Sequence, residues 1–166
     1  MSVRLRRLMD KDAQYMLEWM HDEELVEFLS ANFAEKTIED CKRFIANSYD
    51  EDSDVNLAIV DDLDEYMGTV SLKHIDRINS SAEFAICTRR CSMGKGYAAA
   101  GMAEIIRMGH EELNIESIYW CVSKYNTRAV RFYDKNGYNR ITAVPEYISD
   151  KYTEEQCEDF IWYKSK

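Results

Sequence analysis

The spacing of hydrophobic residues in the first third of the chain predicts a short strand followed by three helices. Val3 and Leu5 alternate with polar neighbours, as in a strand with one buried face. Asp10 then precedes apolar residues at helical spacing, and Thr37-Ile-Glu-Asp40 resembles a capping box at a helix start. The apolar sets of the three expected helices are Ala13, Met16, Leu17 and Met20; Leu25, Phe28 and Leu29; and Ile38, Cys41, Phe44 and Ile45.

Three strand-like runs occupy the middle of the chain, after an acidic connector at 50–54. These runs are Val55–Val60, Tyr66–Ile75 and Ser81–Cys87. The segments that join them are short, polar and rich in turn-forming residues. Because a parallel crossover needs about a dozen residues, we expect the three strands to be antiparallel neighbours.

The remainder of the chain alternates helices with strands. The expected elements are a long helix after Gly94-Lys-Gly96 with Met102, Ile105, Ile106, Gly109 and Leu113 on one face, a strand at Ile118–Val122, a helix capped by Asn126, and strands at 138–144 and 160–163. Asn136-Gly137 has the residue types that favour a left-handed turn where the second of these helices ends. A polar linker that contains Pro145 joins the last two strands. This order of elements predicts an α/β domain with a mixed sheet.

Length and charge narrow the classes of protein that fit. A chain of 166 residues is expected to form a single domain, here 1–166. The chain has 21 Lys and Arg against 31 Asp and Glu, which gives a formal net charge of −10. This balance argues against nucleic acid as a partner, because such binding relies on Lys and Arg at phosphates. A cationic partner fits the charge better.

The cysteines, histidines and hydropathy exclude further classes. The five cysteines include no CxxC pair, which disfavours a disulfide framework and a structural zinc site. The histidines His21, His74 and His110 are scattered, so no metal is expected. The basic start of the chain has no apolar run, and no stretch of about 18 apolar residues follows. We therefore expect a cytoplasmic protein that does not enter a membrane.

A glycine-rich turn from Arg90 to Ala99 is the first candidate for chemistry. Such a turn between a strand and a helix can present backbone N–H groups to an anion, or it can simply be a tight connection. The Walker pattern fails, since Arg89 stands at its first glycine and Gly96 follows the lysine. A dinucleotide site fits the glycines locally, but that site needs an acidic residue after the next strand, which here ends at Ser123-Lys124.

Two segments resemble motifs of the GNAT superfamily of acetyl-CoA-dependent N-acetyltransferases. Cys91-Ser-Met-Gly94-Lys-Gly96 is similar to the family's pyrophosphate loop, and Asn126 leading to Phe132-Tyr133-Asp-Lys-Asn-Gly137-Tyr138 is similar to its later segment. Ala82-Glu83-Phe84 resembles the branch that acetylates ribosomal-protein N-termini, spermidine and amino sugars. One position departs from the family, because Cys91 stands where Gln or Arg is usual. Backbone N–H groups can still hold the pyrophosphate there, with Arg90 as an alternative cation.

The resemblance implies a mostly antiparallel sheet flanked by helices on both faces, and acetyl-CoA as co-substrate. It also implies which residues hold that co-substrate: Ile86, Cys87, Cys91, Ser92, Met93, Gly94, Lys95, Gly96, Tyr97, Ala98 and Asn126. A backbone N–H near Cys87 would hold the oxyanion. The acceptor is expected to be a small-molecule or peptide amine, and the protein a monomer or homodimer.

Amine acetylation needs a base for the amine and benefits from a proton donor for the departing thiolate. Glu83 shares its strand face with Cys87, so its carboxylate can serve as the base, or it can be a solvated or salt-bridged strand residue. Asn126 and Tyr133 are two helical turns apart and lie on one face. In the family, the tyrosine at the position of Tyr133 is often placed near the cofactor sulfur, whereas its alternative role is packing. Asn126 can cap its helix and also face the pantetheine arm.

The sequence therefore predicts an N-acetyltransferase that passes an acetyl group directly from acetyl-CoA to a primary amine. N-terminal peptides, polyamines and amino sugars are the acceptor classes. A catalytically degenerate CoA-binding module is the main alternative, and a dinucleotide-dependent enzyme is the second. Cys91 as a covalent nucleophile is disfavoured, because no neighbouring residue in the sequence supplies its base.

Overall fold

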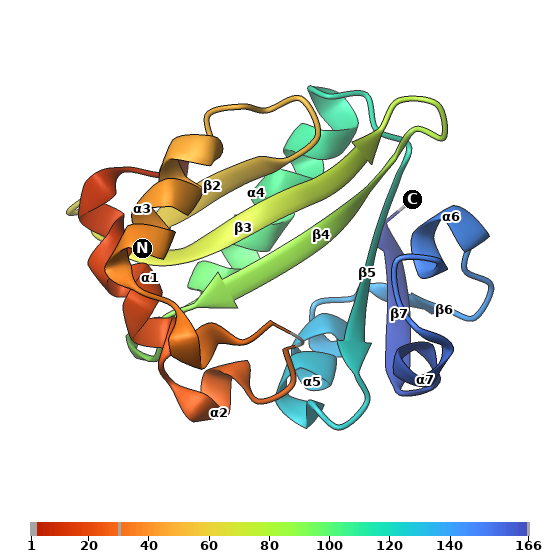
Figure 1. Ribbon diagram of the computed structural model, residues 1–166. Coiled ribbons are helices and arrows are strands. Elements are labelled where there is room, and N and C mark those ends of the chain that lie inside the picture. Colours follow the sequence, from red (N-terminus) through yellow and green to blue (C-terminus); the bar gives the residue numbers. More distant parts are fainter. Residues whose placement is uncertain (1–2, 30, 166) are drawn as a thin grey trace.

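A computed structural model describes residues 3–29 and 31–165 (Figure 1). Seven strands form one sheet in the order β1-β2-β3-β4-β5-β7-β6. The strands are β1 (Arg4–Arg7), β2 (Val55–Val60), β3 (Tyr66–Asp76), β4 (Ser81–Thr88), β5 (Ser117–Ser123), β6 (Asn139–Ile141) and β7 (Phe160–Ser165). Neighbouring strands are antiparallel except for β4 and β5, which are parallel. The predicted mixed, mostly antiparallel sheet is confirmed.

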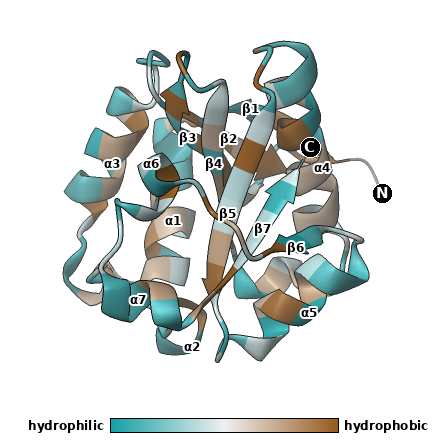
Figure 2. Cartoon of the chain, turned by 90° about the vertical axis from the view of Figure 1, so that its right-hand side faces the viewer, coloured by the Kyte–Doolittle hydropathy of each residue, from teal (hydrophilic) through white to brown (hydrophobic). Residues whose placement is uncertain are grey.

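Helices cover both faces of the sheet, as predicted. The helices are α1 (Ala13–Met20), α2 (Glu23–Val26), α3 (Ile38–Asn47), α4 (Tyr97–Glu111), α5 (Thr127–Lys135), α6 (Glu146–Ser149) and α7 (Glu154–Glu158), with short 3-10 turns η1 (Asp10–Asp12), η2 (Phe33–Glu35) and η3 (Arg90–Ser92). Figure 2 shows α1 and α3 on one side of the sheet and α4 and α5 on the other. None of the helices in the described part of the chain has the length and apolar content needed to cross a membrane.

The face under α1 and α3 is held by a compact hydrophobic cluster that includes Met16, Trp19, Cys41 and Ile45. The predicted capping box begins α3, where the Asp40 N–H donates to Thr37 Oγ1 at 3.2 Å and the Thr37 N–H donates to the Asp40 carboxylate at 2.9 Å. Two expectations on this face were wrong. Phe44 lies at the edge of the buried stripe and is 41% exposed, and α2 ends at Val26.

Because α2 ends early, Phe28 and Leu29 follow it instead of forming its apolar face, and both side chains are exposed. Of the expected second helix, only the turn Glu23–Val26 is therefore helical. Glu27 and Phe28 form a turn, and η2 and α3 follow later in the chain.

The opposite face holds the larger core, under α4 and α5. Met102, Ile105 and Ile106 of α4 are buried there with side chains of β2 to β5, as the helical spacing predicted. Gly101 lets the helix approach the sheet, because a Cβ at this position would lie 2.5 Å from Ile59 Cδ1. The start of α4 is thereby fixed close to the ends of β2 and β4.

The C-terminal region differs most from the prediction. The linker after Pro145 is not a plain loop but contains α6 and α7, and β6 covers only Asn139–Ile141 of the expected 138–144. Pro145 precedes the first residue of α6, and a capping box between Thr153 and Gln156 begins α7. Ile148 of α6 packs with Tyr119 and Trp162 in a third hydrophobic cluster, which attaches this segment to β5 and β7.

Candidate active site

The strands β4 and β5 separate after a short stretch of pairing. Their last paired residues are Glu83 and Tyr119, although β4 continues to Thr88 and β5 continues to Ser123 alongside β7. Figure 1 shows the two strands diverging from their paired end. The part of β4 beyond Glu83 therefore has one backbone edge without a strand beside it.

Alternation of the backbone identifies which groups face this gap. The Arg89 N–H donates to the Met67 carbonyl at 2.8 Å. Hydrogen-bonded pairs recur at every second residue of an antiparallel ladder, so every second residue of β4, counted back from Arg89, is bonded to β3. Cys87 and Ala85 thus bond to β3, while the N–H and C=O of Ile86 turn the other way. The Ser117 N–H donates to the Ser80 carbonyl at 3.1 Å, in agreement with this phase. The backbone groups of Ile86 therefore open into the gap, and those of Thr88 turn to the same side.

Glu83 is buried at the point where the strands part. Its side chain is 4% exposed, and it is held by two residues from the segment between α6 and α7. The Lys151 ammonium donates to one carboxylate oxygen at 3.2 Å, and the Tyr152 hydroxyl donates to the other at 3.1 Å. Burial is also the main reason that the pKa of Tyr152 lies above its ordinary range, so this hydroxyl stays a donor. Glu83 is thus salt-bridged, one of the two states expected for it.

Tyr133 approaches the gap from the other face of the sheet. Its ring packs against Trp120 of β5 and Tyr163 of β7, with centroid separations of 5.6 and 5.1 Å. The side chain is 7% exposed, and burial followed by the nearby Cys87 thiol raises its pKa. Among the described residues, none forms a hydrogen bond with its hydroxyl. The phenol therefore keeps its proton and has it free to donate.

The loop from β4 to α4 has the backbone that its glycines predict. Gly94 and Gly96 have φ angles of +73° and +85°, in the region that favours glycine, and Gly96 is the N-cap of α4. A Cβ at Gly94 would meet nothing within 4 Å, so the space in front of the loop is open. The Ser92 hydroxyl donates to the Arg89 carbonyl at 2.7 Å and is buried. The loop thus offers backbone rather than the serine side chain.

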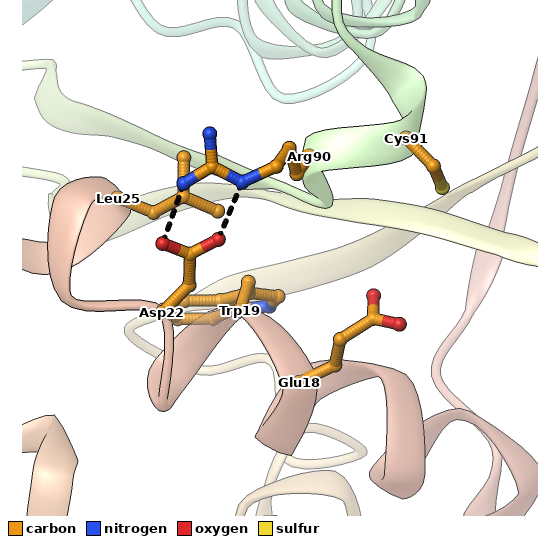
Figure 3. A pocket seen from close by; sticks show the side chains of 6 residues that line it. All are labelled: Glu18, Trp19, Asp22, Leu25, Arg90 and Cys91. Carbon is orange, nitrogen blue, oxygen red and sulfur yellow. Dashed lines mark hydrogen bonds and ion pairs between the residues drawn. The ribbon is translucent and has the colours of Figure 1, made fainter.

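The two arginines before the loop point away from it. Arg89 is buried between Glu18 and Glu65, with contacts of 2.7 Å to each carboxylate. Arg90 forms two hydrogen bonds to the Asp22 carboxylate, at 2.8 and 2.7 Å, as Figure 3 shows. In this structure Arg90 therefore does not replace the side chain that is missing at Cys91.

A different arginine lies against the loop. Arg128, in the first turn of α5, donates to Met93 Sδ at 3.6 Å. This contact also places the start of α5 beside the loop. Asn126 caps α5 as predicted, accepting from the Ala129 N–H at 3.3 Å. Arg128 was missed because nothing in the sequence shows which arginine of an exposed helix turns toward a neighbouring loop.

The residues expected to bind the co-substrate lie on three adjoining pieces of the fold. Ile86 and Cys87 stand on the unpaired end of β4, the segment Cys91–Ala98 forms the loop and the first turn of α4, and Asn126 begins α5. Burial raises the pKa of the Cys87 thiol to about 12, whereas Cys91 is exposed. The arrangement can therefore offer backbone donors, a protonated phenol and a buried carboxylate around one gap.

A hollow of about 380 Å³ lies between α1, α2 and η3. Figure 3 shows its lining residues: Glu18, Trp19, Asp22, Leu25, Arg90 and Cys91. Glu18 pairs with Arg89 and Asp22 pairs with Arg90, but Arg89 also contacts Glu65 and Arg90 also contacts Glu24, so carboxylates outnumber guanidiniums around the hollow. Within the residues that the structure describes, no group of three His, Cys, Asp or Glu side chains is placed to hold a metal ion.

Comparisons with known proteins show the family to which the chain belongs. A family model described as the acetyltransferase (GNAT) domain matches residues 2–139. The spermidine N(1)-acetyltransferase of Escherichia coli strain K12 is 26% identical over 141 residues, which cover 83% of this chain and 73% of the relative.

Solved structures with the same fold include a spermidine N-acetyltransferase from Vibrio cholerae in complex with CoA and spermine. It is 19% identical, with a TM-score of 0.79 over 98% of this chain and 94% of the other. A dodecameric structure of the spermidine N-acetyltransferase from the same organism, in an intermediate state, is 22% identical with a TM-score of 0.72, covering 98% and 92% of the two chains.

Proposed function

The chain belongs to the acetyltransferase (GNAT) domain family and is an N-acetyltransferase that uses acetyl-CoA, and we propose that it acetylates a primary amine of the polyamine class. The observation that carries the proposal is the buried Glu83 carboxylate at the point where β4 and β5 part. The net charge of −10 favours a cationic acceptor. The relatives that act on spermidine support the same class of amine.

We propose that the acetyl-CoA arm lies in the gap along β4. The free backbone groups of Ile86 match the hydrogen-bonding needs of an extended amide chain, as those of a missing strand would. The pyrophosphate would face the N–H groups at the start of α4, where the helix dipole favours an anion. Gly94 and Gly96 keep side chains out of that approach, and Arg128 supplies a cation beside it.

We propose a role for each candidate catalytic residue from the same arrangement. Glu83 would accept the proton from the acceptor ammonium, so that the amine can attack the thioester carbonyl. The Ile86 N–H, adjacent to Cys87, would donate to the oxyanion that develops on that carbonyl. Tyr133 would donate to the thiolate as it leaves. Its raised pKa keeps the phenol protonated at neutral pH, which is the form that this role requires.

The hollow beside Cys91 favours a cation at its rim, because Arg89 and Arg90 are each shared between two carboxylates. We assign the recognition of the reacting ammonium itself to Glu83. A buried carboxylate favours a positively charged partner strongly, since an unpaired buried charge is costly. The Lys151 ammonium already contacts this carboxylate, so an acceptor ammonium would have to take its place.

The proposal is tested by measuring CoA release with four acceptors at matched concentrations: spermidine, spermine, glucosamine and a peptide with a free N-terminus. We expect kcat/KM to be at least about tenfold higher for the two polyamines, a difference of about 1.4 kcal/mol in transition-state stabilisation. A preference for the peptide or the amino sugar would contradict the proposed acceptor. Tight CoA binding with no turnover of any of them would favour the CoA-binding module instead.

A further inference from the structure

The side chain of Lys151 is ion-paired with Glu83, the residue proposed as the general base. The Lys151 ammonium is 3.2 Å from one oxygen of Glu83, and the Tyr152 hydroxyl is 3.1 Å from the other. The Lys151 side chain is 32% exposed, whereas the Glu83 side chain is 4% exposed. The Lys151 amine therefore contacts the carboxylate that, in the proposed function, takes a proton from the acceptor amine.

The position of Lys151 is set by packing on both sides of it. Ile148, three residues earlier, is buried against Tyr119 and Trp162. Tyr152, the next residue, packs edge-on against Phe160 and Trp162, with ring centroids 5.2 and 5.8 Å apart. Tyr119 is also the last residue of β5 that pairs with β4. The lysine is therefore fixed where the strands separate.

We propose that Lys151 is a site of self-acetylation, an inference that rests on the proposed function. In this reaction Glu83 takes a proton from the Lys151 ammonium, and the free amine attacks the thioester carbonyl carbon of acetyl-CoA. The new N–C bond forms as the C–S bond breaks, and CoA leaves as a thiolate that takes up a proton. The products are Nε-acetyl-lysine and CoA.

Two physical features favour this lysine over the others. First, the amine is already held at the candidate base, so it need not be captured from solution as a separate acceptor would be. Second, its partner is a nearly buried carboxylate. Lys11 gives the contrast, because its ammonium is 2.5 Å from Asp64 on the β1 side of the sheet, where both side chains are exposed or half-exposed. Lys11 is therefore the lysine with a more exposed carboxylate partner against which Lys151 can be compared.

Acetylation of Lys151 would change the site that produces it. The acetylated side chain is neutral, so Glu83 would lose its cationic partner and keep only the Tyr152 hydroxyl. A carboxylate that is 4% exposed then has a stronger demand for an incoming ammonium. Self-acetylation would thus convert the site from one that holds its own lysine to one that is open to a foreign amine.

The test uses the full chain with deuterated acetyl-CoA and no acceptor, followed by peptide mass spectrometry over time. We expect Lys151 to be labelled to near one acetyl per chain, with a first-order rate constant that stays the same over a tenfold range of protein concentration. Glu83→Gln should lower the rate on the order of a hundredfold. Lys151→Arg should remove the label, because a guanidinium keeps the cation on Glu83 but is not acetylated.

Labelling of Lys11 and of the heat-unfolded chain gives the chemical background. Label at Lys151 no faster than this background, or a rate proportional to protein concentration, would overturn the inference. Circular dichroism of both variants shows whether they are folded. The same samples are assayed for acetylation of spermidine: spermidine turnover without label at Lys151 rejects self-acetylation alone, whereas the absence of both rejects the proposed function with it.

Discussion

The two sides of the gap between β4 and β5 are built in different ways. On the side of α4, the candidate pyrophosphate site consists of backbone within one short stretch, with Gly94 and Gly96 in left-handed conformations. On the side of Glu83, the site depends on side chains that are 68 and 69 residues away in the sequence, Lys151 and Tyr152. The first side needs a local turn, whereas the second exists only when the C-terminal segment is folded onto β5 and β7.

This difference predicts that affinity for acetyl-CoA and the rate of acetyl transfer respond to different substitutions. Backbone donors at a helix N-terminus tolerate most side-chain changes, provided that the glycines remain. A buried carboxylate is sensitive to any change in its partners, because it is nearly removed from water. We therefore expect substitutions near Glu83 to alter turnover, and substitutions in the loop to alter affinity for acetyl-CoA.

The largest effect is expected for Glu83→Gln, which keeps the shape of the side chain and removes its charge. A general base contributes about a hundred- to ten-thousand-fold, so the single-turnover rate with spermidine should fall by at least about a hundredfold. Affinity for acetyl-CoA, measured by calorimetry, should stay within about twofold. A fall of less than about threefold between pH 6 and 9 would show that Glu83 is structural.

Tyr133→Phe should have the next largest effect, because it removes only the hydroxyl. A hydrogen bond to a charged partner contributes about 1.5–3 kcal/mol, so kcat should fall roughly tenfold to a hundredfold at nearly constant acetyl-CoA affinity. Tyr163→Phe is the matched control in the same aromatic cluster, since its hydroxyl donates to Asp134 at 3.0 Å. Equal single-turnover rates for the two variants would show that the Tyr133 hydroxyl has no role in acetyl transfer and that the ring only packs in the core.

Gly94→Val should affect binding rather than turnover. The added side chain meets no protein atom at its Cβ, and it projects into the open space in front of the loop. We expect the Kd for acetyl-CoA to rise about tenfold, equivalent to about 1.4 kcal/mol. Gly137→Val is the control, because Gly137 also has a positive φ, +81°, with no neighbour within 4 Å, at the end of α5. Equal losses of CoA affinity would point to backbone strain instead.

The smallest effect is expected for the change in cysteine alkylation when CoA binds. Cys91 is exposed at the first position of the loop, whereas burial raises the pKa values of Cys87 and Cys121 to about 12. Because the thiolate is the reactive form, iodoacetamide at pH 8 should label Cys91 and leave the other two thiols largely unmodified. Bound CoA should slow the labelling of Cys91 several-fold, as followed by peptide mass spectrometry. Labelling of Cys91 at the same rate with saturating CoA would place the ligand elsewhere.

Local signals in the sequence were sufficient for much of this fold. The strands β2, β3 and β4 agree with the predicted runs to within one residue at each end, because alternation and short polar turns define them locally. The capping box at Thr37, the cap at Asn126 and the glycine turn before α4 were also confirmed. Each of these features is formed by residues only a few positions apart.

The partners of Glu83 could not be predicted, because their contacts depend on the tertiary fold. Lys151 and Tyr152 lie in a polar linker whose two short helices have weak periodicity, and only the packing of Ile148 on β5 and β7 brings them to Glu83. Arg90 shows the same limit. Its position in the sequence suggested a role in the loop, but Asp22 of the α1–α2 connection holds its guanidinium.

Amide hydrogen exchange at Ile86 tests the central claim, that the arm of acetyl-CoA takes the place of a strand beside β4. In the free protein the Ile86 N–H faces the gap, while the Cys87 N–H is bonded to β3 and provides an internal control. We predict that saturating acetyl-CoA slows exchange at Ile86 by at least about tenfold and leaves Cys87 nearly unchanged. Exchange at Ile86 that is the same with and without bound acetyl-CoA would contradict the account.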